Sequence, residues 1–159
     1  MAEAAKCALP GLAQHRSCYP VDMMEINVNR APFLTLWASV VARRLGYDEE
    51  EALTLGRAVA GLTAQSKGRR LGIYTPRSDE ERETLQAKRE ELGAETVELM
   101  DRSIPCMRTK NGLRALDKAS PANPASVRKY LVGRFKEALP LVERKLAKLA
   151  ETFDPAELD

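Results

Sequence analysis

Two amphipathic segments, separated by a glycine and a capping aspartate, constrain the fold of this chain more than any other feature. In the first segment, apolar side chains recur at steps of three and four residues, which predicts a helix with one apolar face. These residues are Leu34, Trp37, Val41 and Leu45, and Asn29 is the expected N-cap.

Gly46 and Asp48 predict that the first helix ends in a tight turn and that a second helix follows at once. Gly46 fits the left-handed residue that closes many helices, and Asp48 fits an N-cap. Carboxylates in the first turn are favoured by the helix dipole. They are followed by an apolar face made of Ala52, Leu55, Ala58, Val59 and Leu62. We therefore predict a helix–tight turn–helix unit.

Such a unit resembles the helix-turn-helix of DNA-reading proteins, whose second helix brings its first residues to the base edges. Here those positions hold four carboxylates, Asp48, Glu49, Glu50 and Glu51. Phosphates would repel them, so the sequence favours a packing unit over a base reader.

The middle of the chain predicts a loop, an exposed helix and a short ribbon. Residues 65–77 contain two glycines and a proline, which favours a loop. Ser78 with Glu81 forms a capping box for a third helix that runs to Gly93 and has few apolar residues. Residues 96–116 alternate in part and contain Asn111–Gly112, which favours a small antiparallel ribbon, although residues 94–101 also fit a helix.

The C-terminal third predicts two further helices. Asn123 and Pro124 are a typical cap and first helical residue, and Pro140 is expected to break the helix that follows. The residues expected to face inward are Val127, Leu131, Phe135, Val142, Leu146 and Leu149. The predicted fold class is therefore mainly α: a compact helical domain with a helix–tight turn–helix unit and, as an option, a small β-ribbon.

The predicted organisation has three parts. Residues 1–22 are expected to form a flexible N-terminal arm, residues 23–153 a single helical domain, and residues 154–159 a frayed or truncated helix start. The chain has no run of 18 apolar residues, which argues against a membrane span. Without a signal-peptide pattern, and with three widely spaced cysteines, a cytoplasmic location is expected.

The net charge of +2 is an average over segments of opposite sign. Residues 75–102 hold five basic and nine acidic side chains, for −4, whereas residues 103–153 hold eleven and four, for +7. Such asymmetry is typical of proteins with an anionic partner, and also of helices whose charged faces pair with each other.

Two basic clusters are the candidate anion-binding or nucleic-acid-binding sites. Lys67, Arg69 and Arg70 surround a glycine, so that side-chain cations and backbone amides could meet one phosphate. The alternative is that they stabilise the negative end of the second helix. Arg128 and Lys129 lie off the apolar stripe of their helix and are expected to be exposed.

The sequence offers little for catalysis, metal binding or a cofactor. His15 is the sole histidine, and its spacing from Cys7 and Cys18 matches no standard zinc site. No nucleotide loop or nucleophile elbow is present, and Cys106 is expected to be a buried small hydrophobe. We therefore expect a protein that is not an enzyme, with no cofactor and no metal.

The run NVNRAPFLTLWASVVARRLGYDEEEALTLGRAVAGLTAQSKGRRLGIY, with the later GLRAL and SVRKYL, resembles an uncharacterised family of small bacterial proteins. The resemblance covers about residues 25–153. It implies a mostly helical cytoplasmic protein whose relatives continue with further helix, and it supplies no functional residues.

Two functional hypotheses follow from these observations. The first is a non-enzymatic nucleic-acid-associated or regulatory module, which binds DNA or RNA phosphates through the two basic clusters. The alternative is a protein-interaction or homo-oligomerisation domain, in which apolar surface beside the short C-terminal helix docks on a partner. Neither hypothesis involves a membrane.

Overall fold

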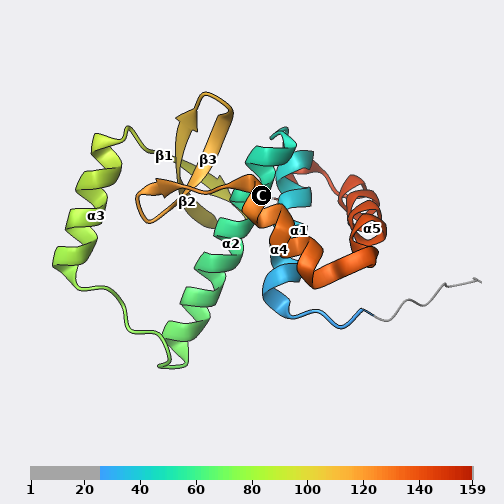
Figure 1. Ribbon diagram of the computed structural model, residues 1–159, viewed down its shortest axis with the longest axis horizontal. Coiled ribbons are helices and arrows are strands. Elements are labelled where there is room, and N and C mark those ends of the chain that lie inside the picture. Colours follow the sequence, from blue (N-terminus) through green and yellow to red (C-terminus); the bar gives the residue numbers. More distant parts are fainter. Residues whose placement is uncertain (1–25, 159) are drawn as a thin grey trace, which may run out of the picture.

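The computed structural model describes residues 26–158, which are mostly helical and carry a small antiparallel sheet (Figure 1). The mainly helical class is thus confirmed. In chain order the elements are α1 (Arg30–Arg44), α2 (Glu49–Arg70), α3 (Asp79–Glu91), β1 (Glu95–Leu99), β2 (Arg102–Thr109), β3 (Gly112–Asp117), β4 (Ser120–Pro121), α4 (Pro124–Phe135), the short 3₁₀ helix η1 (Lys136–Ala138), α5 (Leu139–Glu151) and α6 (Pro155–Leu158).

Helices α1 and α2 pack against each other more extensively than any other two elements. Gly46, between them, has a φ of +105°, the left-handed conformation that glycine adopts without strain. Asp48 caps α2 in a full capping box, because its side chain accepts from the Glu51 N–H and the Glu51 carboxylate accepts from the Asp48 N–H.

Gly56 is the point of closest approach between these two helices. A β-carbon at this position would lie 2.5 Å from the carbonyl oxygen of Thr35 and 2.8 Å from the backbone nitrogen of Ser39. Thr35 and Ser39 are themselves buried, and each turns its hydroxyl back to a carbonyl of its own helix. Glycine thus lets the two backbones meet directly.

Helix α1 lies between two apolar cores. Ala38, Val41 and Ala42 face a core shared with α2 and the sheet. Leu36 and Val40 face a second core shared with α4 and α5. The predicted single stripe accounts for one side of α1 only, because this helix is covered on more than one face.

The sheet has strand order β1-β2-β3-β4, and every neighbouring pair is antiparallel. The expected ribbon is therefore larger than predicted, and β1 occupies the segment for which helix was also an option. Gly112, with a φ of +100°, follows the two-residue turn that joins β2 to β3.

Polar groups at the start of α2 attach this helix to β3. The Glu51 carboxylate accepts from the Leu113 N–H at 2.8 Å, and the Thr54 hydroxyl accepts from the Ala115 N–H at 3.2 Å. Glu50 forms an ion pair with Arg114, a charged side chain that is only 5% exposed. The carboxylates that argue against base reading therefore hold the fold together.

The structure corrects two details of the sequence prediction. Residues 65–70 are helical, not a loop, because Gln, Lys and Arg are good helix formers and Gly68 is tolerated where Tyr74 folds back on it. Leu149, predicted to face inward, is 47% exposed, and Ala150 is buried in its place.

The remaining helix starts follow the sequence. Ser78 caps α3 with a capping box, and α3 has no buried residue. Asn123 caps α4, and the chain bends through η1 before α5, which carries Pro140 in its first turn. The predicted arm of residues 1–22 lies outside the described residues.

Candidate anion-binding site

A cavity of about 370 Å³ lies where the beginning of α1 meets the end of α2. Its wall comes from three elements, since the first residue of β2 also reaches it. The lining residues are Arg30, Ala31, Leu34, Ala60, Thr63, Ala64, Ser66, Lys67, Arg70 and Arg102.

Four of these side chains are cations: Arg30, Lys67, Arg70 and Arg102. Within residues 26–158, none of the four forms an ion pair, and no carboxylate lines the wall. Like charges gathered around one cavity repel each other unless an anion enters. The electrostatics of the cavity therefore favour an anionic ligand.

The fold fixes the backbone position of each cation. Lys67 and Arg70 lie in the last turn of α2, and the contact of Gly56 with α1 sets where that turn lies against Arg30. Arg102 opens β2 directly after a two-residue turn and pairs with Leu99, which is fully buried and anchors that end of the sheet.

Helix dipoles explain only part of this cluster. Lys67, Arg69 and Arg70 lie at the negative end of α2, where cations stabilise a helix. Arg30, in contrast, opens α1, whose first turn has no acidic residue and whose Asn29 side chain makes no capping hydrogen bond. A cation at the positive end of a helix is unfavourable for that helix, so the dipole gives no reason for Arg30 to be there.

The sequence prediction therefore overlaps with this cavity in part. Lys67 and Arg70 line it, whereas Arg69, on the same turn, lies outside the wall, and all three are exposed. Arg30 and Arg102 were missed. The signal for Arg30 was an arginine at a helix start without a neighbouring acid, but Arg102 carries no local signal, since only the fold of the sheet brings it here.

The second predicted cluster lies far from the cavity. Arg128 pairs with Glu49, at the beginning of α2, and with Glu143 of α5 at 2.7 Å. Eighteen residues of helix separate Glu49 from Lys67, about 27 Å at 1.5 Å per residue. Lys129 is exposed near Arg128. The two basic clusters do not form one site.

Two arginines of the same chain contact the ring of Tyr130. The Arg57 guanidinium lies 4.7 Å from the centre of the ring, and that of Arg134 lies 5.7 Å from it. These are cation–π distances. The half-buried ring thus links α2 to α4.

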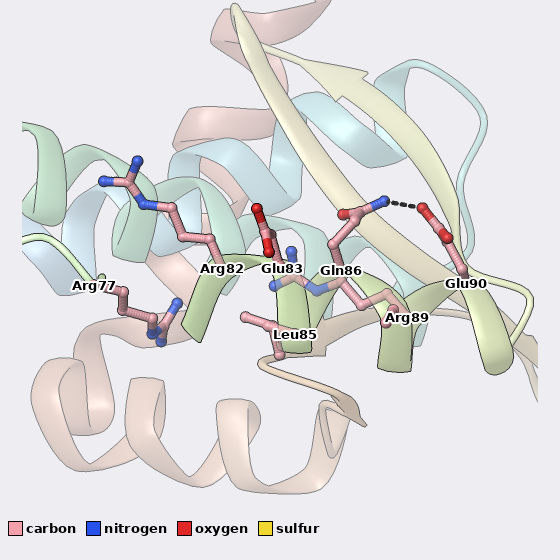
Figure 2. A pocket seen from close by; sticks show the side chains of 8 residues that line it. Arg77, Arg82, Glu83, Leu85, Gln86, Arg89 and Glu90 are labelled. Carbon is pink, nitrogen blue, oxygen red and sulfur yellow. Dashed lines mark hydrogen bonds between the residues drawn. The ribbon is translucent and has the colours of Figure 1, made fainter. Parts of the chain in front are cut away.

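A second cavity, of about 500 Å³, lies along α3 (Figure 2). Arg77 and Arg89 reach toward it, but Glu83 and Glu90 also line it, and Gln86 donates a hydrogen bond to Glu90 at 2.9 Å. Burial, and then the charge of Arg77, lower the pKa of Arg89, whose Nε donates to the Lys118 carbonyl. Because charges of both signs line this cavity, it selects less clearly for an anion.

The described residues contain no group of three or more His, Cys, Asp or Glu side chains placed to hold a metal ion. His15, Cys7 and Cys18, whose spacing matches no standard zinc site, lie outside the described residues. Cys106 is fully buried, as expected. Burial, and then the charge of Glu95, raise the pKa of its thiol to about 12, so the nucleophilic thiolate is disfavoured.

No protein-family model, curated protein or solved structure matches the chain. Within residues 26–158, no helix is both long enough and apolar enough to cross a bilayer. The resemblance to a bacterial family and the cytoplasmic location stay predictions.

Proposed function

We propose that this protein is a non-enzymatic module that binds nucleic-acid phosphates at the cavity between α1 and α2. The observation that carries this proposal is the convergence of four cations from three elements on a wall without a carboxylate. Arginine binds phosphate well, because the planar guanidinium offers parallel N–H donors that match two phosphate oxygens.

Two features of the wall support phosphate as the ligand. Thr63 and Ser66 add hydroxyl groups, which can donate to phosphate oxygens between the cations. Exposed Arg69, beside the cavity, extends the positive surface along which a strand could run. Contacts to phosphate alone do not read bases, so we expect binding with little sequence preference.

A salt titration tests this proposal. Fluorescence anisotropy with a labelled single-stranded oligonucleotide should show binding that weakens as salt rises. Each phosphate neutralised on a single strand contributes a slope of about −0.7 in log K against log salt, so one or two phosphates held at the cavity give a slope of about −0.7 to −1.4. The double variant Arg30→Gln/Arg102→Gln should weaken binding and bring the slope closer to zero.

The matched control is Lys145→Gln/Lys148→Gln, which removes the same charge from exposed positions on α5. If both double variants weaken binding equally, net charge and not the cavity is responsible. If the unaltered protein binds neither DNA nor RNA at low salt, the proposal is wrong.

A protein-interaction function is the second candidate, and a specific observation favours it. Helix α3 buries none of its residues and stands beside the sheet away from the two cores (Figure 1). In the segment that connects α2 to α3, Ile73 is 80% exposed and Leu71 is 56% exposed. Light scattering over a range of concentrations should then show self-association that Ile73→Ser abolishes. A monomer at every concentration would contradict self-association.

A further inference from the structure

We infer that the cavity between α1 and α2 receives the terminal phosphate of a nucleic-acid strand, a phosphomonoester, in preference to an internal phosphodiester. This inference rests on the proposed function and names the ligand of the same site. It follows from the size of the cavity, its charge and the apolar part of its wall.

The size of the site suits a single nucleotide. The cavity is bounded by the first turn of α1, the last turns of α2 and the beginning of β2, and its volume is about 370 Å³. An internal phosphate carries a nucleoside on both sides, whereas a terminal phosphate carries one.

The charge of the site suits a dianion. A phosphomonoester carries close to two negative charges at neutral pH and has three free acceptor oxygens, whereas an internal phosphodiester has one charge. Arg30, Lys67, Arg70 and Arg102 exceed what one phosphodiester can neutralise. The more highly charged end therefore gains more from the same four cations.

The apolar part of the wall suits the first nucleoside. Ala31, Leu34, Ala60 and Ala64 line the cavity together with the cations. Its volume of about 370 Å³ falls in the range of small-ligand sites, about 300–1,000 Å³. A phosphate alone would leave this apolar surface uncovered, while a terminal nucleotide can place its sugar or base against it.

The test compares one oligonucleotide sequence in four forms. The first carries a 5′-phosphate, the second a 3′-phosphate, the third hydroxyl groups at both ends, and the fourth is circular and has no end. An internal fluorescent label keeps both ends of the linear forms free. We expect at least one phosphorylated form to bind about tenfold more tightly than the hydroxyl and circular forms.

A nucleoside monophosphate should compete for the site, because it carries the same phosphomonoester and one nucleoside, and inorganic phosphate should compete less well. If inorganic phosphate competes equally, the apolar wall contributes nothing and the terminal-nucleotide assignment is wrong.

Variants localise the preference. Arg30→Gln/Arg102→Gln should abolish the tighter binding of the phosphorylated oligonucleotide, and Lys145→Gln/Lys148→Gln should leave it unchanged. Circular dichroism melting checks that each variant is folded. If a variant is unfolded, the comparison of the four oligonucleotide forms on the unaltered protein still tests the preference for a terminal phosphate.

The outcomes separate this inference from the function on which it rests. Equal binding of all four forms would overturn the terminal-phosphate preference and leave phosphate binding standing. The absence of binding to every form would overturn both.

Discussion

Gly56 shows how one residue without a side chain sets the geometry of the molecule. Its position against Thr35 and Ser39 determines how closely α1 and α2 approach, and hence where the end of α2 lies against Arg30. The cavity therefore depends on a contact that lies about one helical turn from its wall residue Ala60.

Gly56→Ala is expected to lower the free energy of unfolding by about 3 kcal/mol, since the new methyl group has to displace backbone atoms. Gly61→Ala is the matched control in the same helix, because a β-carbon there meets nothing within 4 Å. It should raise the free energy of unfolding by about 0.5–1 kcal/mol through better helix propensity. Urea denaturation measures both, and equal effects would refute the packing argument.

Cys106 is expected to resist alkylation in the folded protein. Its thiol is buried and its pKa is raised to about 12, so the thiolate population stays small at pH 8, far below that pKa. Iodoacetamide labelling followed by peptide mass spectrometry should leave Cys106 unmodified until urea unfolds the chain. Rapid modification under native conditions would show that the thiol is accessible.

At the scale of elements, polar contacts decide how the sheet docks on α2. Glu51 and Thr54 accept hydrogen bonds from backbone N–H groups of β3 that point away from the neighbouring strand β2. Without these acceptors, buried donors would be left unsatisfied. The first two turns of α2 thus supply hydrogen-bond acceptors that a further strand would otherwise provide.

Thr54→Val keeps the shape of the side chain and removes the oxygen that accepts from the Ala115 N–H. We expect a loss of about 1–3 kcal/mol in the free energy of unfolding, because that donor would be buried without a partner. Thr84→Val, on exposed α3, removes a hydroxyl that bonds the Glu80 carbonyl and should change stability by less than about 0.5 kcal/mol. Thermal melting of the two variants compares them directly.

At the scale of the whole molecule, some basic side chains form ion pairs between helices and others face solvent without an acidic partner among the described residues. Arg128 joins α4 to α2 and α5 through Glu49 and Glu143. The cations of the cavity pair with no acid among residues 26–158. A basic sequence segment therefore does not by itself mark a binding surface.

Arg128→Gln is expected to lower the free energy of unfolding by about 1–2 kcal/mol, because two carboxylates lose their partner. Its effect on oligonucleotide affinity should be small. Its partner Glu49 lies about 27 Å from Lys67 along α2, beyond the Debye length of about 8 Å in physiological salt. A loss of affinity as large as that of Arg30→Gln/Arg102→Gln would show that Arg128 contributes to oligonucleotide binding.

Local sequence signals located most helix ends correctly, because caps act over three or four residues. Asp48 with Glu51, Ser78 with Glu81, and Asn123 with Pro124 all begin helices as predicted. The same local rules placed the end of α2 too early. Gly68 weakens a helix in isolation, but here it accommodates the return of Tyr74.

The candidate site was harder to predict, because its parts are distant in the sequence. Lys67 and Arg70 form a visible cluster, whereas Arg30 and Arg102 are single arginines in unremarkable contexts. Arg128 and Lys129 formed an equally visible cluster, and the structure pairs Arg128 with acids of two other helices.

The sequence by itself determined the helical class, the capped starts of α2, α3 and α4, the glycine turn after α1 and the exposure of α3, since each depends on contacts within a few residues. Only the tertiary structure decided which cations are neutralised and which converge. Electrostatic interactions act across space and not along the chain, and the docking of α1, α2 and the sheet brings four cations to one cavity.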